Sequence, residues 1–551
     1  MRLFSTLCGG FTALLSILLL SGCGGGSSTP TPPPPPPPVP VQVTVTLSGS
    51  GGGGIVTSAP AGIDCGTTCS HTFAAGTQVT LNATPATGFS FGGWSGACAG
   101  SGACTLPTSG TQSVTASFST GASLQSINHI IFMVQENRGF DHYFGHLNDY
   151  RTAPPYNLPP DVDGTPANAS NPSADGLSVV TPFLMNSACV ENQSPSWNES
   201  HTQYNRQDPL SAIATMDGFV YISSKDDASN GGFDPGGTRA MGYYDATALP
   251  YYHFMATNFA TSDKWFAPVL TRTQPNRMYL MAGTSVGHVY PLPPGSPPLT
   301  NKTIFELLDE NNISWKVYVT NSNSPNPLAG TLFSMYAYAQ GPGLKNIVPA
   351  TQFLTDAANG SLPQVAMIEP GYGASDTDEH PATSTPGGNI QKGAAYVSSL
   401  INGLMQSPSW SDSVFILTWD EGGGFYDHVA PYPTVSPDGI PPIDLAGPPN
   451  PDICYQNTTA PTCVFLYSGF RVPMILISPF ANKNSVSHVY RDYTSILKLI
   501  ERRFSLPSLT MRDAAQPDMD EFFDFANVPW KTPPPLQTQP RNLPCYIDHL
   551  P

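Results

Sequence analysis

The sequence predicts an α/β protein with a mostly parallel sheet and helices on both faces, preceded by a small all-β module. Apolar runs of strand length recur in the second part of the chain, at residues 130–134, 315–319, 365–368, 414–417 and 474–477. Helical patterns at 303–311, 393–406 and 493–504 lie between them. Such alternation is typical of parallel sheets covered by helices. In residues 41–120 apolar and polar residues alternate instead, which predicts the all-β module.

Composition excludes one class of partner. The chain of 551 residues has 22 basic and 39 acidic residues and a formal charge of −17. It contains no run of lysine and arginine, so we expect no binding to nucleic acid. A hydrophobic content of 40% argues for a folded protein.

The first residues predict export. Arg2 precedes an apolar stretch at 11–20, and Leu-Ser-Gly-Cys ends at Cys23. This ending resembles a bacterial lipobox, which implies that residues 1–22 are a lipoprotein signal peptide and that Cys23 carries lipid. The alternative is an ordinary signal peptide that leaves a free cysteine. Residues 23–40 are rich in Gly, Ser and Pro and are expected to form a tether. The expectation is an exported bacterial lipoprotein, anchored to the membrane and facing the periplasm or the cell exterior.

The module at 41–120 contains Cys65, Cys69, Cys98 and Cys104. Export favours disulfides over a four-cysteine zinc site, and four cysteines allow three connectivities. With FGGWSG around Trp94, the module resembles divergent internalin-type B-repeats, which implies a spacer or a weak adhesion module. Later in the chain, Cys454 and Cys463 flank a short loop that they could close. Cys189 and Cys545 would then tie remote segments together.

Two predicted strands end in oxygen ligands. SVFILTWDEGGGFYDHV places Asp420 and Glu421 directly after one strand, and Glu136 and Asn137 follow the strand at 130–134. Adjacent carboxylates repel each other unless a cation or a proton neutralises them. Ligands collect beyond the carboxyl ends of the strands in open α/β sheets. The sequence therefore predicts a metal site, with helix caps and turn residues as the alternative interpretation.

A third stretch, VLTRTQPNRMYLMAG, places Thr273 just ahead of a predicted helix whose first turn contains Pro275. A hydroxyl at the positive end of a helix can attack phosphorus when a metal lowers its pKa, and the N–H groups there bind anions. Considered alone, a threonine in this position is usually a helix cap.

The motifs ENRGFDHYFG (136–145), TQPNR (273–277) and DEGGGFYDHV (420–429) together resemble the phosphoesterase family of bacterial and plant non-specific phospholipases C and acid phosphatases. The resemblance covers most of residues 125–505, including MGYYDATALPYYHF and the DEHP stretch. Gly139 stands where the family commonly has Ser. The resemblance implies an alkaline-phosphatase-like fold for residues 121–551.

The resemblance also implies roles for individual residues. Glu136, Asn137, Asp420 and Glu421 would hold one divalent metal ion, and Thr273 would form a phosphothreonyl intermediate. Asn276, Arg277 and Asp427 would bind substrate. Oxygen ligands favour Ca²⁺ or Mg²⁺, and Zn²⁺ remains open.

Three histidines are candidates to protonate the leaving oxygen or to bind a phosphate oxygen: His201, His380 and His428. Each could instead be a hydrogen-bonded structural residue. The predicted function is a metal-dependent, phospholipase C-like hydrolase acting on phosphodiesters such as phospholipid head groups, since the phospholipase members of the family resemble this chain in having Thr at the nucleophile position. The alternatives are an acid phosphatase that scavenges phosphate and a non-catalytic surface-attachment lipoprotein.

Overall fold

The structure is a computed structural model, and it describes residues 40–49, 53–86, 89–100, 102–106, 110–119, 123–320, 326–372, 377–382 and 388–550. The predicted signal peptide, the lipidated Cys23 and all of the tether but its last residue lie outside these residues. Among the described residues, no helix is both long and apolar enough to span a membrane.

The N-terminal module consists of two four-stranded sheets, with strand orders β4-β1-β8-β6 and β3-β2-β5-β7. Its strands are β1 (Val41–Gly49), β2 (Gly54–Ala59), β3 (Asp64–Cys65), β4 (Ser70–Phe73), β5 (Val79–Pro85), β6 (Ser90–Gly96), β7 (Cys104–Leu106) and β8 (Gln112–Ser119). Val41, Val43 and Val45 are buried and alternate with polar residues, as the period-2 pattern predicts. Disulfides join Cys65 to Cys69 and Cys98 to Cys104, so the prediction of disulfides rather than zinc is confirmed.

The large domain is built on an eight-stranded sheet of order β17-β16-β18-β9-β19-β20-β14-β21. These strands are β9 (His129–Gln135), β14 (Ala260–Ser262), β16 (Trp315–Val319), β17 (Ile347–Pro349), β18 (Val365–Glu369), β19 (Ser413–Trp419), β20 (Met474–Ile477) and β21 (Ser485–Ser487). From β17 to β19 all pairs are parallel, whereas β20 runs antiparallel to both β19 and β14. The predicted mostly parallel sheet is confirmed, with each predicted apolar run forming a strand.

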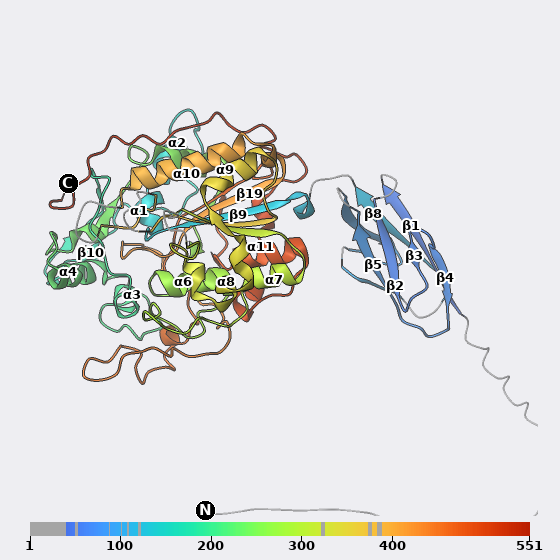
Figure 1. Cartoon of the computed structure of the whole chain (residues 1–551), viewed down its shortest axis with the longest axis horizontal. Helices are drawn as coiled ribbons and strands as arrows, with labels where there is room; N and C mark the ends of the chain where they lie inside the picture. Colours follow the sequence, from blue (N-terminus) through green and yellow to red (C-terminus); the bar gives the residue numbers. More distant parts are fainter. Residues whose placement is uncertain are drawn as a thin grey trace, which may run out of the picture. The chain divides into compact units, whose positions relative to one another are not determined.

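Helices cover both faces of this sheet. Figure 1 shows α9 and α10 along one side of β9 and β19, and α6, α7, α8 and α11 on the other. The helices are α1 (Phe140–Phe144), α2 (Leu147–Thr152), α3 (Trp197–Tyr204), α4 (Phe219–Asn230), α5 (Pro250–Asn258), α6 (Thr273–Ala282), α7 (Ile304–Glu310), α8 (Ala337–Gln340), α9 (Thr351–Ala358), α10 (Ile390–Met405), α11 (Ser495–Phe504) and α12 (Met511–Ala515). The three predicted helical patterns correspond to α7, α10 and α11.

Short strand pairs lie outside the main sheet: β10 (Asn171–Pro172) with β11 (Val179–Val180), β12 (Phe183–Leu184) with β13 (Gly242–Tyr243), and β15 (Trp265–Phe266) with β22 (Arg491–Asp492). Two disulfides tie long connections of this domain together. Cys189 bonds to Cys545, and Cys454 bonds to Cys463. Both pairings agree with the sequence prediction.

Candidate active site

The two acidic stretches meet because their strands are neighbours. β9 and β19 pair in parallel, and the last pair in register is Gln135 with Trp419. Glu136 and Asp420 therefore leave the sheet side by side. The backbone N–H of Asn137 donates a hydrogen bond of 2.8 Å to Oδ1 of Asp420, which joins the two loops directly. Asn137 has a φ of 56°, a left-handed conformation that asparagine tolerates better than most residues.

A glycine lets the second loop approach the first. Gly423 has a φ of 67°, and a Cβ at this position would lie 2.1 Å from the carbonyl oxygen of Asn137. No side chain can occupy that space. The N–H of Gly423 also donates to Oε2 of Glu421 at 2.6 Å, which fixes that carboxylate. The three glycines after Glu421 thus include at least one that the site geometry requires.

Thr273 faces this junction from α6. Its hydroxyl Oγ1 lies 3.4 Å from Oε2 of Glu136 and 3.4 Å from Oδ1 of Asn137. The sequence predicted Thr273 just ahead of the helix, but it is the first residue of α6, and Arg272 is the N-cap. The first-turn N–H groups of a helix have no partner within the helix, and this hydroxyl belongs to the first turn of α6.

Arg277, one turn further along α6, forms ion pairs with the buried carboxylates of Glu136 and Asp420. Its Nη2 donates to Oε1 of Glu136 at 2.6 Å, and its Nε lies 3.6 Å from Oδ2 of Asp420. Arg277 as a residue is 1% exposed, and its guanidinium also donates to the carbonyls of Val134 and Gln135. Its contacts are therefore with the ends of the strands and with the acidic residues.

The loops after β9 and β19 meet at what we call the acidic junction, formed by Glu136, Asn137, Asp420 and Glu421. Its carboxylates can carry more negative charge than the neighbouring arginine neutralises. Glu136, Asp420 and Glu421 are all buried, and among the described residues only Glu136 and Asp420 contact the guanidinium of Arg277, so full ionisation of the three would leave two negative charges. Burial, followed by repulsion from Asp420, raises the pKa of both Glu136 and Glu421 well above the usual range. Oδ2 of Asp420 and Oε1 of Glu421 are buried and have no hydrogen-bond partner in the described parts of the chain. A divalent cation fits this set of oxygen donors, because it would compensate the two negative charges of the fully ionised set.

His380 is the predicted histidine that has a ring nitrogen without a partner among the described residues. Its Nδ1 lies 2.7 Å from the carbonyl of Pro381, and no hydrogen bond to Nε2 occurs among the described residues. Burial lowers the pKa of His380, opposed by the Pro381 carbonyl and by Asp420. The residue before it, Glu379, is bonded to both acidic loops: it accepts from Nε1 of Trp419, which precedes Asp420, and from the guanidinium of Arg138, which follows Asn137. Nε2 is thus the atom that can exchange a proton with a ligand.

His428 and Asp427 belong instead to an ionic network around Arg471. Nδ1 of His428 lies 2.7 Å from Oδ2 of Asp141, and its Nε2 lies 3.2 Å from Asp163. Arg471, fully buried, donates to Asp427 at 2.9 Å and to Asp141 at 2.8 Å. This guanidinium lies among Asp141, Asp427 and His428, whose ligand atoms could otherwise gather around a metal.

Sequence reasoning missed Arg471 and Asp141. Arg471 precedes β20 by three residues, in a stretch that is otherwise apolar. An arginine is rarely buried unless it pairs with carboxylates. Its presence in an apolar stretch is therefore the signal that could have identified Arg471 as part of a buried ion pair. Its two ion pairs tie α1 to the loop that carries Asp420 and Glu421.

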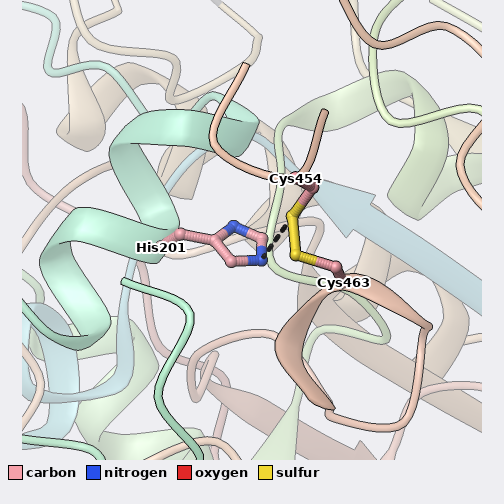
Figure 2. Close-up of side chains that lie close together, drawn as sticks. All are labelled: His201, Cys454 and Cys463. Atoms are coloured by element: carbon pink, nitrogen blue, oxygen red, sulfur yellow. Dashed lines mark hydrogen bonds between the residues drawn. A yellow bond between two sulfur atoms is a disulfide. The ribbon is translucent and has the colours of Figure 1, made fainter. Parts of the chain in front are cut away.

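His201 lies against the disulfide between Cys454 and Cys463. Figure 2 shows its ring pointing at this bond, with Nε2 4.0 Å from Sγ of Cys454. Both ring nitrogens also face backbone carbonyls, those of Trp197 at 2.7 Å and Thr462 at 3.0 Å. The two sulfur atoms are bonded to each other, so this His and Cys group is not available as a metal site in the oxidised protein.

The side-chain amide of Asn276 forms hydrogen bonds with backbone groups of the protein. Its Oδ1 accepts from the N–H of Val269, and its Nδ2 donates to the carbonyls of Thr271 and Arg272. The residue is fully buried. These contacts shape the loop that delivers Thr273.

The chain is similar to known families and proteins. The Phosphoesterase family matches residues 127–507, and the Divergent InlB B-repeat domain matches residues 43–122. Non-specific phospholipase C1 of Arabidopsis thaliana is 31% identical over 433 residues, which cover 73% of this chain and 72% of the relative. Phospholipase C B of Mycobacterium tuberculosis (strain CDC 1551 / Oshkosh) is 30% identical over 445 residues, covering 75% and 80%.

Among solved structures, the chain is similar to a protein in the alkaline phosphatase superfamily from Vibrio parahaemolyticus. The TM-score is 0.29 and the identity 11%, with 65% of this chain and 76% of that chain covered, a likeness too weak to support further argument. The family match covers more than half of the chain and includes all three motifs. The protein therefore belongs to the phosphoesterase family, as a hydrolase that acts on phosphoester bonds.

Proposed function

We propose that the chain is a metal-dependent, phospholipase C-like hydrolase that cleaves phosphodiesters through a phosphothreonyl intermediate. One observation carries the proposal. The hydroxyl of Thr273, at the first residue of α6, lies 3.4 Å from oxygen atoms of both Glu136 and Asn137. A nucleophile, an acidic junction and a helix N-terminus thus share one space.

The metal ion would be held by Glu136, Asn137, Asp420 and Glu421. Their oxygen atoms favour Ca²⁺ or Mg²⁺, although Zn²⁺ is used by some oxygen-rich sites. When bound, a divalent cation polarises a phosphoryl oxygen and lowers the pKa of a nearby hydroxyl.

The chain's own groups would carry the reaction in two steps. The hydroxyl of Thr273 gives its proton to water and attacks phosphorus, and the bond from phosphorus to the alcohol oxygen breaks. His380 enters this step protonated, and its Nε2 gives that oxygen a proton. Water then attacks the phosphothreonyl group, with the same nitrogen as base, and releases the phosphorylated head group. The N–H groups at the start of α6 stabilise the charge on the phosphoryl oxygens.

Other predicted site residues receive supporting roles in this proposal. Arg277 keeps Glu136 and Asp420 in place, Asn276 shapes the loop before Thr273, and Asp427 and His428 are held by Arg471 and Asp141. Their polar groups have partners inside the protein, which argues against direct contact with substrate. His201 supports the loop closed by Cys454 and Cys463.

We propose phospholipids or related phosphodiesters as substrates, because the relatives are phospholipases C by name and this chain also has a threonine at the nucleophile position. An exported lipoprotein anchored through Cys23 would act close to such lipids, in the periplasm or at the cell exterior. The second candidate is an acid phosphatase, which would use the same junction on monoesters.

Activity on p-nitrophenyl phosphorylcholine and on p-nitrophenyl phosphate, with and without chelator, tests this proposal. Thr273→Ala should lower kcat by about a thousandfold or more, as loss of a nucleophile does, while the variant still binds the metal. Thr273→Ser keeps the hydroxyl and is the matched control. In acid-quenched Thr273→Ser samples, the mass of the protein should rise by that of the phosphorylated head group less one water. Faster turnover of the monoester would favour the phosphatase, and full activity of Thr273→Ala would refute the mechanism.

A further inference from the structure

A third carboxylate-bearing stretch, beside the acidic junction, contains a buried glutamate that the mechanism does not use. Glu379 immediately precedes His380 and is 0% exposed. Its carboxylate accepts three hydrogen bonds, from Tyr143 Oη at 2.8 Å, from Tyr252 Oη at 2.5 Å and from Trp419 Nε1 at 3.1 Å. All three donors are neutral, and they come from α1, α5 and the end of β19.

The partners of Glu379 are placed so that they connect the two sides of the proposed reaction centre. Trp419 immediately precedes Asp420, and Tyr143 lies in the helix that follows the Glu136 loop. The guanidinium of Arg138 also donates to the backbone carbonyl of Glu379. The side chain and the main chain of one residue are therefore both bonded to the segments that carry the acidic junction.

Packing leaves this carboxylate little freedom. A Cβ on Gly393, in the first turn of α10, would lie 2.4 Å from Cγ of Glu379, so the helix backbone presses against the side chain. A shift of Glu379 would move His380 with it, because consecutive residues share a rigid peptide unit.

We propose that Glu379 is a positioning residue, which fixes His380 relative to Asp420 by bonding to Trp419, Tyr143 and Tyr252. The inference rests on the proposed role of His380 as the proton donor. It assigns a function to a side chain that would not touch substrate, metal or the reacting atoms.

The ionised form of the carboxylate is the form that suits its neighbours. An ionised Glu379 accepts from all three donors, whereas a protonated one brings a fourth hydrogen into a space where donors already converge. Burial, opposed by the hydrogen bonds from Tyr252 and Tyr143 and by Arg138, raises the pKa of Glu379 to about 7. Among the described residues, the charged and titratable groups that face it are Arg138, Tyr143, Tyr252 and, further away, Tyr244.

Because the role depends on the ionised form of Glu379, it should appear in the pH dependence of kcat. The three hydrogen bonds should be intact above about pH 7 and weaken as the pH falls through the pKa of Glu379. Removing one donor destabilises the ionised form and raises this pKa further. The acid side of the kcat profile should then move to higher pH, and a residue with a merely structural role would not produce that shift.

Three variants of the full chain test the inference. Glu379→Gln is isosteric, but its NH₂ group meets the donors of the tyrosines and of Trp419. Tyr252→Phe removes one donor to Glu379. Tyr251→Phe, at the neighbouring position on α5, is the matched control, because it loses a partly buried phenol hydrogen bond of 3.1 Å to Asn402 and none to Glu379.

For each variant we would measure kcat and KM from pH 5 to 9, together with the affinity for Ca²⁺. Glu379→Gln should lower kcat by about 10- to 100-fold, the size of effect expected when a catalytic group is displaced by about 1 Å, with KM and Ca²⁺ affinity unchanged. Tyr252→Phe should shift the acid limb of the kcat profile to higher pH, and Tyr251→Phe should behave as wild type.

Wild-type kcat and an unshifted profile in Tyr252→Phe would overturn the inference, as would equal shifts in Tyr252→Phe and Tyr251→Phe. If Glu379→Gln does not fold, as judged by circular dichroism, the comparison of the two tyrosine variants decides the question. The proposed function fails separately, namely if the wild-type protein turns over no phosphoester or if Thr273→Ala retains activity.

Discussion

Arg277 allows the charge argument for the metal site to be tested through stability alone. We consider Arg277→Met, which keeps an unbranched buried side chain and removes the guanidinium. The loss takes away an ion pair of 2.6 Å with Glu136, a second of 3.6 Å with Asp420, and the donors to the carbonyls of Val134 and Gln135. Three buried carboxylates then face each other without a guanidinium in direct contact.

The expected loss in unfolding free energy follows from the burial of Arg277, Glu136 and Asp420. Removing one side of a fully buried ion pair typically destabilises a protein by about 3–5 kcal/mol, because the remaining charge stays buried. Without metal we expect a loss of this size in the free energy of unfolding of the large domain. A divalent cation at 100 times its Kd adds about 2.7 kcal/mol to any protein that binds it only when folded, so it should offset a large part of the loss.

Denaturant unfolding followed by tryptophan fluorescence, in chelator and in Ca²⁺, measures both quantities. Arg502→Met is the matched control, because Arg502 pairs with Asp520 in a partly exposed position. Its removal should cost less than about 1 kcal/mol in either condition. If Arg277→Met and Arg502→Met were equally stable in chelator, the acidic junction would not carry the uncompensated charge that we assign to it.

Two further predictions concern the same region. Asp420→Asn keeps the oxygen that accepts from Asn137 and removes one negative charge. It should weaken Ca²⁺ binding at least about tenfold in titration calorimetry, and unchanged affinity would exclude Asp420 as a ligand. Burial lowers the pKa of His428, but its bond to Asp141 outweighs this and raises the pKa overall. The stability that His428 contributes should therefore be complete below the ordinary value of 6.5 and be lost as the pH rises through the raised pKa. The difference in unfolding free energy between wild type and His428→Gln should shrink over that range, and a difference that grows with pH would contradict the ion pair with Asp141.

Much of the fold could be predicted because the strands are buried on both faces. Residues 130–134 and 414–417 are continuous apolar runs, and each became the centre of a strand, β9 and β19. The run at 474–477 was also predicted correctly as a strand, yet its antiparallel direction was not, since a short run of apolar residues does not encode the direction of the chain. Direction depends on the length and path of the connection before it, and here a long connection with the Cys454–Cys463 disulfide intervenes.

The histidines show what local sequence cannot provide. His201 and His428 lie in polar stretches like that of His380, but their ring nitrogens meet carbonyls or carboxylates from remote segments: Thr462 is 261 residues from His201, and Asp141 is 287 residues from His428. A polar sequence context predicts neither kind of partner. What separates the three is whether each ring nitrogen has a partner in the described parts of the chain, and this depends on tertiary packing.

The acidic junction itself follows from one fact of topology. Glu136 and Asp420 are far apart in the chain, and their sequences predict only that each follows a strand. Parallel pairing of β9 and β19, with Gln135 opposite Trp419, makes both strands end at the same level. Any shift in this register would separate Asn137 N from Asp420 Oδ1 and move both carboxylates away from Thr273, since adjacent positions on a strand lie more than 3 Å apart. Register is held by the buried residues of both strands and, at the site, by the hydrogen bonds of Trp419 and Asn137. The core that stabilises the sheet therefore also sets the distances on which the proposed chemistry depends.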